Sequence, residues 1–321
     1  DAPGTRAASV PRNRAPLLRR AAAALREDAE RFAALVTAEN GKTLRDAREE
    51  VTFAADYLEW FADEALRIDG RIVTAPDGRN QHQVVRAPIG PSLVVSPWNF
   101  PLAVPARSIG AALAAGCTVV ARPSALAPLS ALSLARLLAD AGLPAGVLNV
   151  VVSSTDDATD PLLADPRLSK LTFTGSRPVG THLARLAAER TLPAALELGG
   201  CAPFIVMADA DLDAAVAGAV AAKMRNAGAA CTAASRFYVE RPIAEEFTCR
   251  LAEQIRAIRV GRGTRPAVGC GPMISARQVA RLAELVADAV ARGARVVVPG
   301  GPVPGKGHFF APVVLADVPA D

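Results

Sequence analysis

The sequence predicts an α/β protein built around a parallel β-sheet. The first observation is an alternation that begins at Pro91, in which short apolar runs are separated by segments with helical spacing. These runs are "SLVVS" (92–96), "TVVARP" (118–123), "VLNVVVS" (147–153) and "LTFTGS" (171–176). The second observation is that the alternation recurs in "PFIVM" (203–207), "RFYVE" (236–240) and "ARVVVPG" (294–300). Short apolar strands separated by helices are typical of βαβ units and therefore of a parallel sheet.

The segment before this alternation is expected to be helical. Apolar residues recur at helical spacing over most of residues 11–68, and "ENGK" at 39–42 interrupts the pattern. Residues 71–90 then indicate two short strands on either side of "PDG", which is a turn signal. We expect an exposed hairpin there.

Length and composition limit the class of protein. With 321 residues, of which 51% are hydrophobic, the chain can form one large domain or two ordinary ones with a substantial core. No apolar run approaches the roughly 18–20 residues of a membrane span, and the polar opening "DAPGTRAASVPRNR" has no signal-peptide core. We therefore expect no membrane partner and a cytoplasmic location. The first residue is Asp, so we also expect that the natural start is missing.

Cysteine and charge patterns argue against three further classes. The five cysteines are an odd number and include no CxxC pair, which disfavours a disulfide framework and a metal site and indicates a reducing compartment. The net charge is +4, but the basic residues are scattered and almost all are Arg. We therefore expect no nucleic-acid partner, because such a footprint would gather on one face.

Three predicted strand ends carry chemically distinctive residues. In "SPWNFPL" (96–102), two prolines stiffen a loop that holds Asn99 where open α/β sheets bind ligands, so its amide is a candidate oxyanion donor. "FTGSRPVG" (173–180) offers backbone N–H groups to a pyrophosphate, although it lacks the GxGxxG pattern. In "LELGG" (196–200), we expect the flanking leucines to enclose Glu197 and to raise its pKa toward that of a general base. The simpler interpretations are a turn asparagine and a surface glutamate.

A fourth segment, "KMRNAGAACTAASRFYVE" (223–240), places Cys231 among small residues. Cysteine alone is more often a buried small hydrophobe than a nucleophile. Together with Asn99, Glu197 and the phosphate-type turn, however, it fits one reaction plan. Cys231 attacks a carbonyl, Asn99 and the Cys231 N–H stabilise the oxyanion, a nucleotide takes a hydride, and Glu197 activates water for thioester hydrolysis.

The motifs "PWNFP", "ALAAGCTVV", "FTGS", "LELGG" and "RNAGAACTAASR" resemble the aldehyde dehydrogenase superfamily in order and spacing, and the resemblance covers essentially the whole chain. It implies that Cys231 is the nucleophile. It also implies a Rossmann-like cofactor domain at 1–199, into which an oligomerisation hairpin at 69–88 is inserted. The catalytic α/β domain would occupy 200–321 and lack its C-terminal part, and the complete protein would be a homodimer or homotetramer.

The resemblance also implies a cofactor site. Its residues are expected to be Ser96, Pro97, Trp98, Arg122, Ser124, Ala125, Gly175, Ser176, Val179, Leu198 and Gly199. In "ARPSALAP", Arg122 and Ala125 stand where the family commonly has Lys and Glu. Because no acid is present to repel a 2′-phosphate and Arg122 can attract one, we expect NADP, with NAD as the alternative.

Within the superfamily the chain most resembles succinate-semialdehyde dehydrogenases. The matching arginines for the substrate carboxylate are Arg107 and Arg225, and a guanidinium suits a carboxylate because it binds both oxygens. Two positions depart from the pattern. Ala233 replaces a second cysteine found in some relatives, so no disulfide switch is expected, and Ala229 replaces the commoner Gln, which leaves other aliphatic or aromatic aldehydes open as substrates.

The sequence stops at "APVVLADVPAD", where relatives continue with a Glu-x-Phe-Gly-Pro segment and the rest of the catalytic domain. We expect either a fragment or a truncated relative. In the second case the chain would be a non-catalytic binding or scaffold protein.

Overall fold

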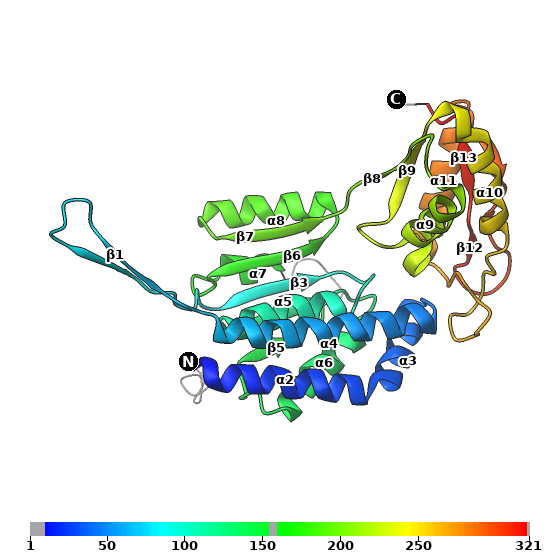
Figure 1. The fold of residues 1–321 in the computed structure, drawn as a ribbon. Helices are drawn as coiled ribbons and strands as arrows, with labels where there is room; N and C mark the ends of the chain where they lie inside the picture. The colour runs from blue at the N-terminus through cyan, green and yellow to red at the C-terminus, as the bar shows by residue number, and fades with distance from the viewer. Residues whose placement is uncertain (1–9, 154–158, 320–321) are drawn as a thin grey trace. The chain divides into compact units, whose positions relative to one another are not determined.

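The computed structural model describes residues 10–153 and 159–319 (Figure 1). The chain divides into two compact units. Unit 1 comprises Asp1–Leu35 and Arg48–Leu198, and unit 2 comprises Val36–Ala47 and Gly199–Asp321. The assignment of cofactor binding to 1–199 and of catalysis to 200–321 stays a prediction, because compactness does not assign a function. The polar opening at 1–9, from which we expect no signal peptide, lies outside the described residues.

Unit 1 is built on a five-stranded parallel sheet, which confirms the predicted α/β class (Figure 1). The strands are β3 (Ser92–Ser96), β4 (Val119–Pro123), β5 (Leu148–Val150), β6 (Lys170–Gly175) and β7 (Ala194–Leu198), in the order β5-β4-β3-β6-β7. Every residue of the central strand β3 is buried, as expected for a strand that is covered on both faces. The chain runs outward from β3 to β5 and then returns to the other side of β3 at β6. The gap between β3 and β6 is therefore a topological switch point, beside which such sheets bind ligands at the carboxyl ends of their strands.

Helices pack on this sheet along the chain (Figure 1). They are α5 (Ala103–Ala114), α6 (Leu129–Asp140), α7 (Thr159–Ala164) and α8 (Arg177–Glu189). Helix α5 contacts β3 and β4, α6 contacts β5, and α8 contacts β6 and β7. One core cluster joins β6 to α8 through Leu171, Phe173 and Leu183, all of which are buried. Burial of such side chains contributes roughly 1.5–3 kcal/mol each, which holds the end of β6 against the start of α8.

The first helical segment is interrupted twice. Its parts are α2 (Pro11–Glu27), α3 (Ala29–Asn40) and α4 (Leu44–Leu66). The interruption expected at 39–42 is confirmed, and Gly41 has a φ of +92°, which favours glycine. A second break at Asp28 was not predicted. The expected hairpin is also confirmed: β1 (Arg71–Thr74) pairs antiparallel with β2 (Gln81–Val84), and both strands are exposed throughout.

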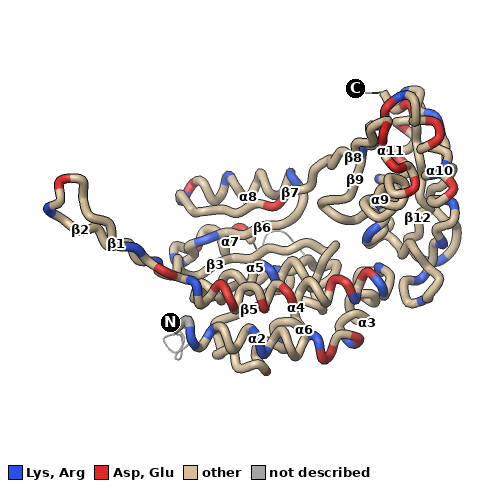
Figure 2. The backbone as a smooth tube through the Cα atoms, viewed as in Figure 1, with Lys and Arg blue, Asp and Glu red and all other residues tan. Residues whose placement is uncertain are grey.

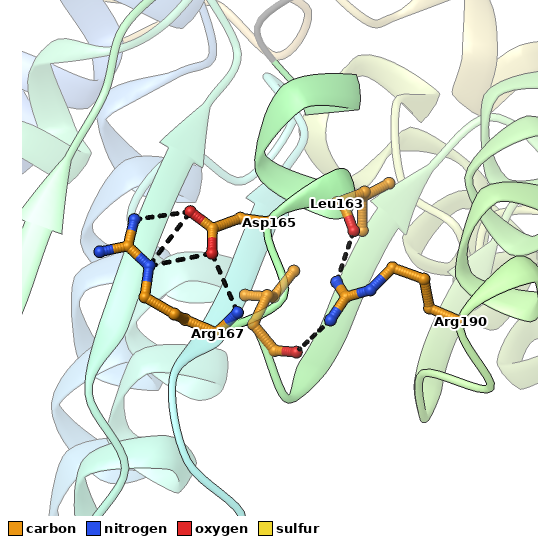
Figure 3. Close-up of polar contacts among 5 residues, drawn as sticks. Leu163, Asp165, Arg167 and Arg190 are labelled. Carbon is orange, nitrogen blue, oxygen red and sulfur yellow. Dashed lines mark hydrogen bonds and ion pairs between the residues drawn. The ribbon is translucent and has the colours of Figure 1, made fainter.

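The turn between α7 and β6 is held by charged side chains (Figure 3). Arg167 donates three hydrogen bonds from its guanidinium to the Asp165 carboxylate, at 2.6–3.3 Å, and its backbone N–H donates a fourth at 2.9 Å. These bonds hold the pKa of Asp165 well below its usual range. Arg190, just after α8, donates to the carbonyl oxygens of Leu163 (2.6 Å) and Leu168 (3.3 Å). Together these contacts fix the entry into β6.

Unit 2 contains a second parallel pair, β8 (Ala202–Val206) with β9 (Ala234–Val239). Its helices are α9 (Leu212–Met224), α10 (Ala244–Arg256) and α11 (Ala276–Ala291), with short 3-10 turns at η2 (Arg225–Gly228) and η3 (Arg241–Ile243). Two antiparallel pairs complete it: β10 (Arg295–Val298) with β13 (Val314–Ala316), and β11 (Gly301–Pro302) with β12 (Phe310–Ala311). Of these four strands, the sequence predicted only β10. The core joins α9 and α10 through Val216, Phe247 and Leu251.

Glycines let the segment after α3 pack closely in unit 2. A Cβ at Gly271 would lie 2.1 Å from the carbonyl oxygen of Gly41, and one at Gly263 would lie 2.2 Å from that of Lys42. The Leu44 N–H also donates to the Gly263 carbonyl at 3.0 Å. The backbone at residues 41–44 is therefore packed directly on residues 263–271, which explains why Val36–Ala47 clusters with unit 2.

Charges of both signs are interspersed along the helices (Figure 2). Arg19 pairs with Asp63 at 2.6 Å, and Arg26 pairs with Asp56 at 2.8 Å and Glu59 at 2.5 Å, which joins α2 to α4. These pairs are exposed, so each contributes little to stability. Among the described residues, no helix is long and apolar enough to cross a membrane.

Candidate functional site

Asn99 lies in the short loop that connects β3 to α5, at the carboxyl end of the central strand. Strand β3 is paired on both sides and ends at Ser96, and α5 begins at Ala103. Asn99 and its neighbours 97–100 are half-buried. The location expected for the candidate oxyanion donor is therefore confirmed, while its role stays a prediction.

Glu197 lies on β7, but its surroundings differ from those we expected. Its neighbours Leu196 and Leu198 are half-buried and pack against the core cluster of β6 and α8. Successive side chains of a strand point to opposite faces, so Glu197 points away from that core and is exposed. The expectation that the leucines enclose Glu197 was wrong, and with it the reason that we gave for a raised pKa.

Cys231 lies in a turn between η2 and β9 and is exposed. The alternative of a buried small hydrophobe is therefore wrong for this cysteine. It does describe Cys117 and Cys270, which are both buried. Burial, and secondarily the charge of Asp46, raises the pKa of Cys270 to about 11. Because the thiolate is the nucleophilic form, Cys270 is a poor candidate for nucleophilic attack.

The turn before Cys231 has an unusual backbone. Asn226, Ala227 and Gly228 have φ values of +54°, +52° and +79°, three consecutive residues in the left-handed region. Asn and Gly tolerate this conformation, but in Ala it costs about 1–2 kcal/mol. Asn226 is 3% exposed and holds the turn by donating from Nδ2 to the Ala229 carbonyl at 3.1 Å. The sequence places this strained, well-anchored turn three residues before the candidate nucleophile.

Lys223, at the end of α9, folds back along this turn. Its Nζ lies 3.8 Å from the position that a Cβ of Gly228 would occupy. Burial lowers the pKa of Lys223, and the nearby Cys201 opposes that shift. The register of β8 and β9 pairs Ala202 with Ala234, so Cys201 lies at the same end of the strand pair as the Cys231 turn. We did not single out Lys223 from the sequence, because only the fold brings it to this turn.

The residues expected to bind phosphate lie where β6 passes into α8. Ser176 is the N-cap residue of α8, and within the described residues its side chain makes no capping hydrogen bond. Pro178, at the second helical position, carries no N–H. The first-turn N–H groups of Arg177 and Val179 thus remain directed out of the helix end, which fits an anionic group. Apart from its chain neighbours Leu198 and Gly200, nothing in residues 10–153 and 159–319 lies within 4 Å of a Cβ built on Gly199.

The segment expected to bind the adenosine ribose follows β4. Arg122, on β4, is 9% exposed. Ser124 forms a tight turn, in which its Oγ accepts the Leu126 N–H at 3.3 Å and its carbonyl accepts the Ala127 N–H at 3.1 Å. Ala125 is exposed at the tip of that turn. Because Ala125 carries only a methyl group, this tip presents no charge that would repel a phosphate.

The two candidate substrate arginines differ in their surroundings. Arg107, on α5, is half-buried, and its Nη2 donates to Thr174 Oγ1 at 3.5 Å. Thr174 lies on β6 beside Gly175, so Arg107 reaches the carboxyl end of the sheet. Arg225 is exposed at the first position of η2. Arg107 belongs to unit 1 and Arg225 to unit 2.

The fold gathers the unit 1 candidates at one edge of the sheet. Asn99, Arg122, Gly175 and Glu197 lie at or just beyond the carboxyl ends of β3, β4, β6 and β7. Of the unit 2 candidates, Arg225 lies at the start of η2 and Cys231 lies in the turn between η2 and β9. The parallel topology that the sequence predicted brings the unit 1 residues together, whereas the two unit 2 residues are separated by only five residues of the chain.

Sequence reasoning missed Glu50, which contacts the Asn99 loop. Its Oε1 accepts the backbone N–H groups of Leu102 at 2.9 Å and Ala103 at 3.1 Å. A signal was available, because Glu50 lies within the apolar stripe of α4, next to Val51. A charged residue at a core position needs compensating partners.

A cavity of about 350 Å³ lies elsewhere in unit 1, lined by residues that include Arg14, Gly116, Cys117 and Leu143. Its lining also includes Thr118 and Val147, which directly precede β4 and β5, so it opens at the amino ends of the strands. Ligand sites of such sheets lie at the opposite edge. Within the described ranges, no cluster of three or more His, Cys, Asp or Glu side chains could hold a metal.

Comparisons with known proteins agree with this architecture. The model of the aldehyde dehydrogenase family matches residues 2–321. The chain is 50% identical over 314 residues to a succinate-semialdehyde dehydrogenase of Paenarthrobacter nicotinovorans, covering 98% of this chain and 70% of that protein. It is 43% identical to the succinate-semialdehyde dehydrogenase (NADP+) of Escherichia coli K12, covering 97% and 64%.

A crystal structure described as an NADP-dependent enzyme of E. coli superimposes with a TM-score of 0.97 at 42% identity, covering 99% of this chain and 66% of that one. The chain thus spans about two thirds of the length of the proteins it matches. Since the family model and the relatives match nearly every residue and the fold agrees with a solved structure, the chain belongs to the aldehyde dehydrogenase family.

Proposed function

We propose that the protein oxidises an aldehyde to a carboxylate through a covalent bond to Cys231, with succinic semialdehyde as substrate and NADP as cofactor. The observation that carries the proposal is the exposed Cys231 on a rigid turn of small residues, in a chain of the aldehyde dehydrogenase family. An exposed thiol among small residues leaves room for a carbonyl to approach the sulfur.

The proposed steps assign one task to each residue. The Cys231 thiolate forms a C–S bond to the aldehyde carbon, and the displaced π electrons move onto the carbonyl oxygen. The Asn99 amide and the Cys231 N–H donate to that oxyanion. When bound, the nicotinamide cofactor supplies the hydride acceptor that oxidises the thiohemiacetal to a thioester. Glu197 then takes a proton from water, the water oxygen bonds to the thioester carbon, and the C–S bond breaks to return the thiolate and the acid.

The cofactor proposal rests on the carboxyl edge of the sheet in unit 1. The N-terminal turn of α8, with the Arg177 and Val179 N–H groups directed out of the helix end, fits a pyrophosphate. Arg122 and the uncharged tip at Ala125 favour a 2′-phosphate, and a relative that is 43% identical carries NADP in its name. NAD is the alternative.

The substrate proposal rests on the two arginines and on the names of the relatives. A guanidinium prefers a planar carboxylate partner. Arg107 is the more shielded of the two, and hydrogen bonds to charged groups are worth more when they are shielded from water. We therefore assign Arg107 the larger share of carboxylate recognition and Arg225 the smaller.

The experiment compares succinic semialdehyde with butanal, which matches its length and lacks the charge. The natural enzyme should prefer succinic semialdehyde by about ten- to a hundred-fold in kcat/KM, the value of one lost charge-assisted pair. Arg107→Ala should remove most of this preference and Arg225→Ala less of it, with butanal oxidation preserved. Equal rates for the two aldehydes would refute the substrate, and a lack of oxidation of any aldehyde would favour the non-catalytic alternative.

Oligomerisation and location stay predictions as well. The β1–β2 hairpin supports the expected homodimer or homotetramer, because its exposed strands include Ile72 and Val73 at 67% and 45% exposure. An exposed apolar ribbon is a ready surface for pairing with another chain. Sedimentation of the protein with and without Ile72→Lys measures this directly.

A further inference from the structure

Glu50 is a carboxylate in the interior of unit 1. It lies on α4 and is only 1% exposed, between the buried residues Ala47, Val51 and Ala54. A carboxylate at such a position is costly unless hydrogen bonds replace the water that it loses. The hydrogen bonds that Glu50 makes should therefore indicate its role.

Two backbone N–H groups that donate to Glu50 lie on another element. Its Oε1 accepts the N–H groups of Leu102 and Ala103, at 2.9 and 3.1 Å. These are the N-cap residue and the first residue of α5. A leucine side chain has no acceptor with which to cap a helix, so α4 supplies through Glu50 the cap that the local sequence lacks. A negative charge at this end of a helix is also electrostatically favourable.

This contact fixes one end of the loop that carries Asn99. The other end is fixed by β3, which pairs with β6 up to Val95 and with β4 up to Ser96. Only residues 97–102 lie between, and Pro97 and Pro101 restrict their backbone. A loop this short and stiff has little freedom once both ends are held, so the position of Asn99 depends on the Glu50 contact.

We infer that Glu50 is a positioning residue for the reaction, which anchors the exit of the 97–102 loop and thereby aims Asn99. The inference rests on the proposed function, in which Asn99 stabilises the oxyanion. Glu50 acts through Asn99 and does not itself contact the substrate. A displaced donor loses much of its effect, since misplacement by about 1 Å can reduce a rate by about a hundred-fold.

The test is a double-mutant cycle on the natural full-length enzyme. Glu50→Ala should slow the single-turnover formation of NADPH by about ten- to a hundred-fold. In an Asn99→Ala background the same change should add little, because the group through which Glu50 acts is already gone. Glu50→Gln keeps an acceptor oxygen and should recover most of the rate. Glu49→Ala is the matched control, since Glu49 is the neighbouring residue on α4 and is exposed.

A purely structural role predicts a different pattern. Glu50→Ala would then lower the unfolding temperature. Well below that temperature, the single-turnover rate would either stay unchanged or fall by the same factor with Asn99 and with Asn99→Ala. Either result overturns the inference. If Glu50→Ala does not fold, the cycle is run with Glu50→Met, which removes the acceptor oxygen but keeps most of the side-chain volume. A loss that appears only in enzyme retaining Asn99 supports the inference, and an additive loss or no loss overturns it.

Amide hydrogen exchange separates this inference from the proposed function. Glu50→Ala should speed exchange at Leu102 and Ala103 by about ten-fold relative to Glu49→Ala, because both N–H groups lose a charged acceptor. A wild-type enzyme that oxidises no aldehyde refutes the proposed function, and the exchange rates still decide whether Glu50 anchors the loop. Unchanged exchange at both amides overturns the anchoring itself.

Discussion

Two glycines of unit 2 should respond in opposite ways to the same added methyl group. A Cβ at Gly271 would lie 2.1 Å from the carbonyl oxygen of Gly41 and 3.0 Å from its carbonyl carbon. Ordinary contacts between carbon and oxygen are longer than 3 Å, so backbone must move. A Cβ at Gly218, in the middle of α9, would meet only ring atoms of Phe204, at 3.7 and 4.0 Å. Those are normal van der Waals distances.

The expected free energies follow from these distances. Gly271→Ala overpacks a rigid contact and should lower the free energy of unfolding by about 1–3 kcal/mol. Gly218→Ala should raise it by about 0.5–1 kcal/mol, because Ala is the better helix former and reduces the entropy of the unfolded chain. Urea unfolding, followed by circular dichroism, measures both. A Gly271→Ala variant as stable as wild type, or a Gly218→Ala variant that is destabilised, would refute the packing described at these positions.

Four further predictions concern the candidate site and the β6 turn. Cys231→Ala should abolish aldehyde oxidation and iodoacetamide labelling at this site while cofactor binding survives; retained activity would exclude Cys231 as the nucleophile. Glu197→Gln should leave a burst of reduced cofactor near one equivalent, followed by turnover that is about 10²–10⁴-fold slower; loss of the burst would place Glu197 in an earlier step. Arg122→Glu should reverse the preference for NADP over NAD, and titration with each cofactor measures the two affinities. Equal affinities of the wild-type protein for NADP and NAD would contradict the NADP proposal. Asp165→Asn should reduce the free energy of unfolding at neutral pH, and the reduction should shrink as the pH falls below 3.8, the ordinary pKa of Asp. The reason is that a depressed pKa in the folded state gives stability that is lost when the carboxylate is protonated. A reduction that does not change with pH would mean that the Arg167 contact does not lower the pKa of Asp165.

The sequence predicted those parts of the fold that depend on local pattern. "SLVVS" became the buried central strand, because a continuous apolar run suits a strand that is covered on both faces. The turn signal in "PDG" gave the β1–β2 hairpin. The candidate residues at strand ends were found for the same reason, since the carboxyl ends of parallel strands lie along one edge of a sheet.

Features that depend on tertiary contacts were not predicted. Glu197 was expected to be enclosed by leucines, but the alternation of side chains along β7 turns it away from them. The partners of Glu50 lie on α5, roughly fifty residues along the chain, and only the packing of α4 on α5 brings them together. The antiparallel pairing of β10 with β13 was missed because β13 is too short to show the alternation of apolar and polar residues that indicates a strand.

The backbone before Cys231 connects stability to the proposed chemistry. Left-handed residues persist only where the surroundings over-determine them, and the turn at 226–228 is held at both ends. Helix α9 packs into the unit 2 core through Val216 and Ala219, and β9 is paired with β8. Within the turn, Asn226 is tied to Ala229 by bonds in both directions, at 2.9 and 3.1 Å. The strain at Ala227 is therefore offset by packing on either side. This packing also positions the backbone that leads to the exposed Cys231, the group that attacks a bound carbonyl in the proposed function.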